Sequence, residues 1–199
     1  MVTMDRGQAH ALEAFVAATV LLASVTFALQ VTAVTPLTAS TSSQHIENQQ
    51  AAVAQGLLDA AAENGSLERT LLLENISAED GDNYVAGGPP TVFGRMLNDT
   101  FRERGIAFNV NVHTLRGNQE GKPLYQIELV HMGQPSDHAV SASRLVTLMD
   151  DDVLHELDDE TATPTTTTLD SASSFYVGEQ HTSDPVWSVL KVEVVVWRM

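Results

Sequence analysis

The sequence predicts an α+β protein: an N-terminal hydrophobic helix of transmembrane or pilin-like type, further helices, and an antiparallel β-sheet of about four strands. Three observations predict this class. An uncharged run of 21 residues lies near the N-terminus, two later segments space their apolar residues for a helix, and the C-terminal half alternates apolar and polar residues. About 160 residues follow the run, which fits one domain with one core.

The uncharged run, residues 14–34, would span about 31 Å as a helix, which is long enough to cross a bilayer. The hydroxyls within it can bond to the helix's own carbonyls, so they weaken insertion only moderately. Pro36 is expected to end this helix, or to kink it into a longer stem. A cleaved secretory signal, with a peptidase site after Ala33, is the main alternative, although such signals are usually shorter and more basic at the start.

Charges beside the run predict its orientation. Arg6 is the only nearby cation, and the acidic bulk of the chain lies on the other side, which favours a cytoplasmic N-terminus and an extracellular C-terminal domain. Three sequons follow the run and agree with an exterior domain, so we regard Asn64, Asn75 and Asn98 as candidate N-glycosylation sites.

The composition is strongly acidic, with 26 Asp and Glu against 10 Lys and Arg and a formal charge of −16. Such a field repels phosphate backbones, so nucleic acid is not an expected partner. Only two of the cations are lysines, and this balance is typical of halophilic proteins, with an ordinary acidic protein as the alternative. The chain has no cysteine, which excludes disulfides and thiolate sites. No cofactor is expected.

Two segments after the run have helical spacing. Residues 45–63 lie within an expected stem helix, 37–66, with Ser42 or Ser43 at its start and Gly65 at its end. Residues 92–104 form an amphipathic pattern that Gly105 would terminate. Residues 67–73 fit a short helix or a strand equally well.

Strands are expected in the remaining domain, 67–199, which we take to be the acidic extracellular part. Residues 106–114 and 123–132 alternate and form a hairpin through a turn at 116–122. Residues 142–149 predict a third strand, and 187–197 a central strand covered on both faces. The Thr-rich stretch within 158–184 has little to bury and is expected to be an exposed loop, where O-glycosylation can occur.

No catalytic constellation is expected. The carboxylates at Asp150, Asp151 and Asp152 offer oxygen ligands for calcium, but a solvated acidic face explains them better. The seven histidines contain no zinc-binding spacing, so no metal site is predicted. Ser136, Asp137 and His138 are adjacent in sequence, whereas a catalytic triad is assembled by geometry, so we interpret them as a coincidence.

Residues 6–15, RGQAHALEAF, followed by the hydrophobic run, resemble the N-terminus of archaeal type IV pilin-like proteins. The resemblance implies a prepilin peptidase cut between Gly7 and Gln8, after a basic Arg6, which would remove residues 1–7 as a leader. The hydrophobic segment, 8–36, would stay on the mature protein. Glu13 would then help to register subunits in a filament, although it stands one residue later than the glutamate of the bacterial pattern.

Three further stretches, 43–49, 135–152 and 192–199, are similar to a haloarchaeal family of uncharacterised pilin-like membrane proteins. This resemblance implies no known activity. We therefore predict a non-enzymatic, membrane-anchored surface protein, a pilin-like subunit or minor pilin whose partners are the membrane, like or related pilin subunits and the prepilin peptidase. The alternatives are a stand-alone binding or envelope domain that does not polymerise, a secreted protein cleaved after Ala33, and a secreted or anchored hydrolase.

Overall fold

A computed structural model describes residues 3–76, 83–115, 124–158, 161–180 and 185–198, with the backbone alone given for 3–9, 31–43, 115 and 124. The chain divides into two compact units, Met1–Ile46 and Glu47–Met199. The first unit is helical, and the second combines helices with a four-stranded antiparallel sheet and a two-stranded one. The predicted α+β class is therefore confirmed.

Helix α1 runs from Thr3 to Glu63 without interruption. Pro36 lies inside it, so the prediction that Pro36 ends the hydrophobic helix is wrong, and the stem helix expected from residue 37 is part of the same helix. A proline removes one helical hydrogen bond and crowds the preceding turn, at about 3 kcal/mol. The long helix-forming stretches on both sides explain why the helix continues. It ends as predicted at Gly65, whose φ of 71° is the left-handed conformation that glycine adopts most easily.

Two short helices follow. The ambiguous segment after Gly65 is helical, α2 Ser66–Leu71. Helix α3, Val92–Thr100, begins at Thr91, whose hydroxyl accepts the backbone N–H of Gly94 at 3.2 Å. The predicted segment continues as a 3₁₀ turn, η1 Arg102–Arg104, and Gly105 ends it with a φ of 69°.

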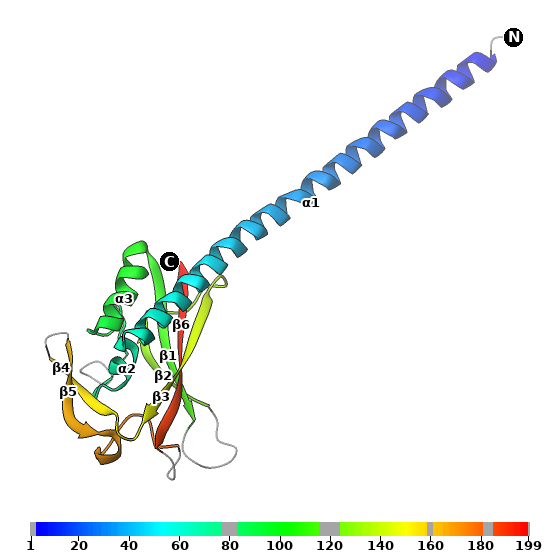
Figure 1. Cartoon of the computed structure of the whole chain (residues 1–199). Coiled ribbons are helices and arrows are strands. Elements are labelled where there is room, and N and C mark those ends of the chain that lie inside the picture. The colour runs from blue at the N-terminus through cyan, green and yellow to red at the C-terminus, as the bar shows by residue number, and fades with distance from the viewer. Residues whose placement is uncertain (1–2, 77–82, 116–123, 159–160, 181–184, 199) are drawn as a thin grey trace. The chain divides into compact units, whose positions relative to one another are not determined.

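The larger sheet contains the four predicted strands in the order β2-β1-β6-β3, all antiparallel (Figure 1). Their bounds are β1 Ile106–Leu115, β2 Leu124–His131, β3 Val140–Met149 and β6 Val186–Arg198. The hairpin of β1 and β2 is confirmed, while its predicted turn at 116–122 lies outside the described residues. Strand β6 pairs with both β1 and β3 and so is central in the sheet, as predicted.

The helices of the second unit pack on one face of the sheet, which we call the core face. The even-numbered residues in the middle of β1 and β6, such as Phe108 and Val192, are fully buried in one cluster with side chains from α1, α2 and α3. Within the cluster the rings of Phe101 and Phe108 lie 6.1 Å apart. The alternation of the strands therefore places half of their side chains in the core.

The opposite face of the sheet, the outer face, carries the odd-numbered residues of the same strands. It is only partly covered: Val195, Lys191 and Glu193 of β6 are half-buried, and Val189 is 39% exposed. The prediction that this strand is covered on both faces is therefore correct for the core face alone.

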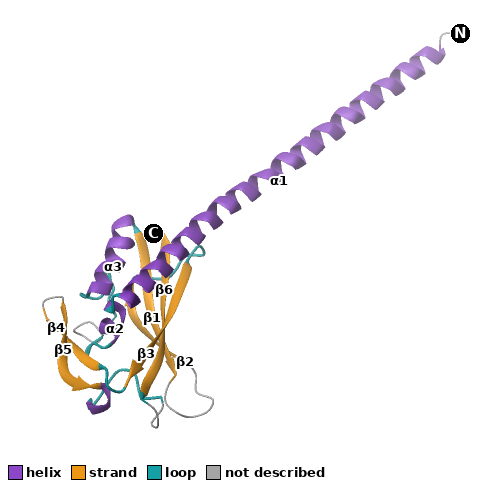
Figure 2. Ribbon diagram, in the orientation of Figure 1, coloured by secondary structure: helices purple, strands orange, loops and turns teal. Residues whose placement is uncertain are grey.

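The prediction that the Thr-rich stretch is a loop is wrong. Residues Thr161–Thr168 form strand β5, which pairs with β4, Val153–Asp158, and leads into the turn η2 Leu169–Ser171 (Figure 2). The tract is exposed, as expected, but β-branched threonine favours extended backbone, and β4 supplies the hydrogen bonds. The hydroxyls of Thr163 and Thr165 add bonds to the carbonyls of Glu156 and Leu154.

Candidate functional site

The most distinctive candidate feature is the apolar part of α1, His10–Gln30. These 21 residues have a mean hydropathy of 2.0, and none of the segment is buried. Phe15 is 70% exposed and Leu22 is 67% exposed. By length and composition the helix can cross a membrane, and a signal sequence at the N-terminus has the same properties. The segment overlaps the predicted run, 14–34, and begins four residues before it; the end of the run falls among residues with no described side chains.

The hydroxyls in this segment bond to the helix's own backbone, as predicted. Thr19 Oγ1 donates to the carbonyl of Phe15 at 2.8 Å, and Ser24 Oγ donates to that of Val20 at 2.8 Å. Thr26 Oγ1 donates in the same way to the carbonyl of Leu22 at 2.6 Å. Each hydroxyl is therefore satisfied without water, which lowers the cost of placing it in a hydrocarbon environment.

Glu13 lies inside the apolar segment, next to a histidine on the preceding turn. The Nδ1 atom of His10, one turn earlier, is 3.6 Å from Glu13 Oε2, and both side chains are about 80% exposed. The i,i+3 spacing in a helix was the signal that would have found this pair. Arg6, Gly7 and Gln8, the expected processing residues, lie in the helical backbone of α1, and their side chains are outside the described set.

The three sequon asparagines have different surroundings. Asn64 is exposed at the end of α1, and its Oδ1 accepts the backbone N–H of Ser66 at 2.8 Å. Asn75 is exposed after α2. Asn98 is half-buried on α3, and its Oδ1 accepts the backbone N–H of Gly88 at 3.0 Å. Asn98 is therefore engaged in holding the 87–90 turn against α3, whereas Asn64 and Asn75 lie at the surface.

The acidic residues 150–152 cap a turn between β3 and β4. Asp152 Oδ2 accepts the backbone N–H of Met149 at 2.7 Å, and Asp150 Oδ1 is buried with no bonding partner among the described residues. Burial, followed by the charge of Asp152, raises the pKa of Glu68, while Arg69 acts to lower it. Within the described ranges, no three potential ligands lie close enough together to hold a metal ion.

The described histidines are dispersed over both units. His138 Nδ1 lies 2.8 Å from Glu47 Oε1 on α1. Ser136 contributes its carbonyl to the N–H of Ala139, so the sequence neighbours take separate roles. Burial lowers the pKa of His155, whose backbone N–H and C=O bond to Leu72 and Glu74.

The outer face carries one charged network that the sequence analysis missed. Glu193 on β6 lies 3.1 Å from His113 Nε2 on β1 and 3.1 Å from Lys191 Nζ. Burial acts to raise the pKa of Glu193, but the hydrogen bonds and charges of Lys191 and His113 outweigh it and hold that pKa below its usual value. The i,i+2 spacing of Lys191 and Glu193 places them on one face, whereas the strand pairing that adds His113 could not be read from the sequence.

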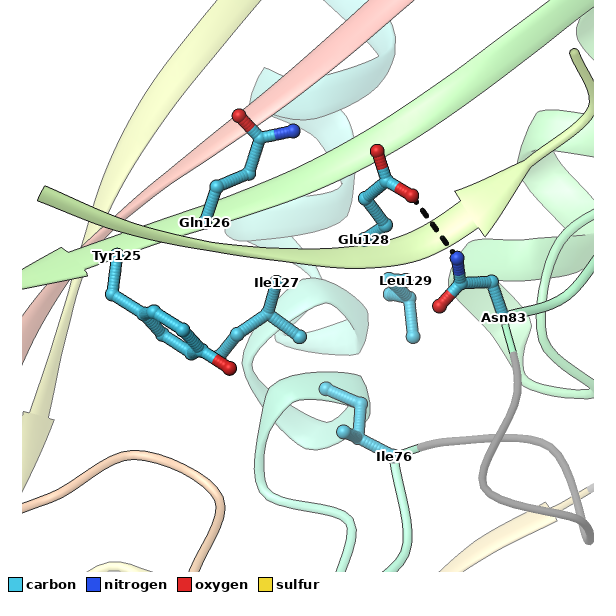
Figure 3. A pocket seen from close by; sticks show the side chains of 7 residues that line it. All are labelled: Ile76, Asn83, Tyr125, Gln126, Ile127, Glu128 and Leu129. Atoms are coloured by element: carbon cyan, nitrogen blue, oxygen red, sulfur yellow. Dashed lines mark hydrogen bonds between the residues drawn. The ribbon is translucent and has the colours of Figure 1, made fainter.

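A cavity of about 390 Å³ lies along β2 (Figure 3). Figure 3 shows Tyr125, Ile127 and Ile76 on one side of the strand and Gln126 and Glu128 on the other. Asn83 Nδ2 donates to Glu128 Oε2 at 3.1 Å. The lining mixes apolar side chains and amide groups with the phenol of Tyr125 and the carboxylate of Glu128.

The comparisons with known proteins give one match. A family model described as a family of unknown function, DUF7288, matches residues 6–196, nearly the whole chain. No curated protein and no solved structure matches the chain.

Proposed function

The chain belongs to this family of unknown function, and we propose that it is a non-enzymatic, membrane-anchored surface protein, a pilin-like subunit or minor pilin. One observation carries the proposal: the apolar segment His10–Gln30 is long enough to span a bilayer and is entirely exposed. Burying apolar area in lipid gains about 25 cal/mol per Å², so such a surface strongly favours a membrane. The bonded hydroxyls of Thr19, Ser24 and Thr26 support the same environment.

The acidic second unit lies outside the membrane in this proposal. Arg6 precedes the apolar segment and favours a cytoplasmic N-terminus. The exposed sequon residues Asn64 and Asn75 follow the segment and suit a surface that meets glycosylating enzymes. The high negative charge keeps such a domain hydrated in concentrated salt.

Topology is tested by cysteine labelling, which is clean here because the chain has no native cysteine. Ser174→Cys introduces a thiol at an exposed position of the second unit. A membrane-impermeant maleimide should label this variant on intact cells as completely as after lysis. Labelling that requires lysis would contradict the extracellular placement, and the cysteine-free parent controls for background.

Assembly is proposed to involve Glu13. A carboxylate inside an apolar segment is costly unless it meets a cation, and a neighbouring subunit can supply one in addition to His10 of the same helix. Glu13→Ala should lower incorporation into surface filaments while the second unit stays folded. Gln30→Ala, a polar position at the other end of the same exposed segment, is the matched control. Equal incorporation of both variants would refute the registry role.

A further inference from the structure

Strand β3 is an edge of the larger sheet, and the bonds of its neighbour show which of its backbone groups face outward. On β6, the carbonyl of Trp187 accepts the N–H of Gln180 at 2.8 Å, and the N–H of Val189 donates to Gln180 Oε1 at 3.2 Å. The backbone N–H and C=O groups of the odd-numbered β6 residues therefore point away from β3, and those of the even-numbered residues point toward it. In the register of the two strands, even-numbered β3 residues lie opposite even-numbered β6 residues, as Ala142 does opposite Val194. The backbone groups of the even-numbered β3 residues are therefore the ones bonded to β6.

The odd residues of β3 consequently direct their N–H and C=O groups toward the open edge. These residues are Ser141, Ser143, Leu145 and Thr147, and all four are exposed. In the part of the chain that the structure describes, no backbone bond outside the β3–β6 ladder involves them. Unpaired edge groups of this kind are a template for another strand.

The other three strand edges, on β2, β4 and β5, are protected by common devices. On β4, the backbone N–H and C=O of His155 bond to Leu72 and Glu74. On β2, the backbone of Tyr84 bonds to Leu129 and His131. A register shift at Val110 and Asn111 also interrupts the pairing of β2 with β1. On β5, Pro164 interrupts the row of donors. Strand β3 has no proline, and its pairing is regular as far as Leu148. It is thus the least protected of the described edges.

The charge of β3 indicates which partner can approach. The whole chain has a charge of −16, yet Val140–Met149 contains no acidic residue. Its one charged residue, Arg144, forms an ion pair with Asp59 of α1. A second copy of the chain therefore meets no carboxylate along this strand. Leu145 adds an apolar contact point, since its side chain is 68% exposed.

We propose that two copies of this chain pair through antiparallel β3 strands, with Leu145 facing Leu145 of the second copy on a twofold axis. In this register Ser143 lies opposite Thr147 of the second copy, and Arg144 lies opposite Val146 rather than another arginine, which avoids like-charge apposition. The outward groups of facing residues exchange both hydrogen bonds, and the two sheets become one. The inference does not depend on whether the chain forms filaments.

Disulfide trapping tests the register. Full-length Leu145→Cys, in detergent micelles at molar salt to screen the acidic charge, should form a disulfide dimer, because facing residues of an antiparallel pair lie within disulfide distance. Gln126→Cys, an exposed position on β2, is the matched control. We expect roughly tenfold more dimer from Leu145→Cys, since only that thiol is held against its copy. Equal trapping of the two variants would overturn the proposal.

Removal of an outward donor tests the pairing itself. Ser143→Pro deletes an N–H that is not bonded to β6, so added to Leu145→Cys it should abolish trapping. In the cysteine-free chain, Leu145→Asp keeps every strand bond and places two carboxylates on the axis, so sedimentation should show loss of the dimer. Trapping that survives the proline and a dimer that survives the aspartate would both contradict the proposal, as would a parent chain that sediments as a monomer.

Discussion

At the scale of single residues, two glycines, one inside α1 and one just after it, have opposite conformational roles. Gly65 ends α1 with a φ of 71°, whereas Gly56 lies inside the helix with nothing within 4 Å of an added Cβ. Gly65→Ala should lower the free energy of unfolding by about 1–2 kcal/mol, the cost of a left-handed alanine. Gly56→Ala should raise it by about 0.4–1 kcal/mol, because the unfolded chain loses freedom. Urea unfolding in detergent, followed by the fluorescence of Trp187 and Trp197, measures both, and shifts of the same sign would contradict this account.

The charged network on the outer face makes a pH prediction. Because His113 and Lys191 hold the pKa of Glu193 below its ordinary value, the folded state binds that proton more weakly than the unfolded state. Glu193 therefore stabilises the fold fully above its unfolded pKa, and the contribution disappears as pH falls through the lower folded pKa. Glu193→Gln should remove this part of the acid sensitivity. Identical pH profiles of parent and variant, between neutral pH and the acid transition, would disprove the assignment.

Some of these residues were predictable and others were not. The two helix-ending glycines, Gly65 and Gly105, followed from their positions after apolar helical patterns, because few other residues adopt a positive φ cheaply. The partner of Glu193 on β1 was not predictable, because it depends on strand order and register. Processing at Gly7 and the assembly role of Glu13 stay predictions.

At the scale of elements, the part of α1 in the second unit packs through one face on successive turns, with Ala54, Leu57, Leu58 and Ala61 buried. Leu58 is fully buried in the core cluster, whereas Val53 is 38% exposed. Leu58→Ala should lower the free energy of unfolding by about 2–5 kcal/mol through the cavity that it leaves. Val53→Ala should change it by less than about 0.5 kcal/mol. The same unfolding assay compares them, and similar losses would mean that the helix is packed differently.

Element types followed from periodicity where one face was buried. The four strands of the larger sheet were all predicted, with bounds within two residues of those found. The predictions failed where periodicity carries no information: β5 consists mainly of threonine, and its order comes from pairing with β4 rather than from burial. The prediction that Pro36 ends the helix failed for a related reason, because the helix-forming stretches on both sides outweigh the local cost of a proline.

At the scale of the whole molecule, the sequence predicted the α+β class and the apolar N-terminal helix, because hydropathy and alternation are properties of long segments. The strand order β2-β1-β6-β3 could not be predicted from the sequence, apart from the central place of β6, because pairing between distant strands leaves no local pattern. The open edge at β3 and the outer-face network both follow from that order. The function proposed here rests on the part that composition predicts best, the exposed apolar helix.

Mass spectrometry of the N-terminal peptide from carbonate-washed membranes tests this central claim most directly. If α1 anchors the protein, the washed membranes should retain the chain, and its first peptide should contain the apolar segment with Glu13 and begin at Gln8 after prepilin-type processing. A start at Met1 would keep the anchor and refute the processing. Recovery of the chain from the soluble fraction with Val34 as its first residue would contradict the account, because the segment would then be a cleaved signal.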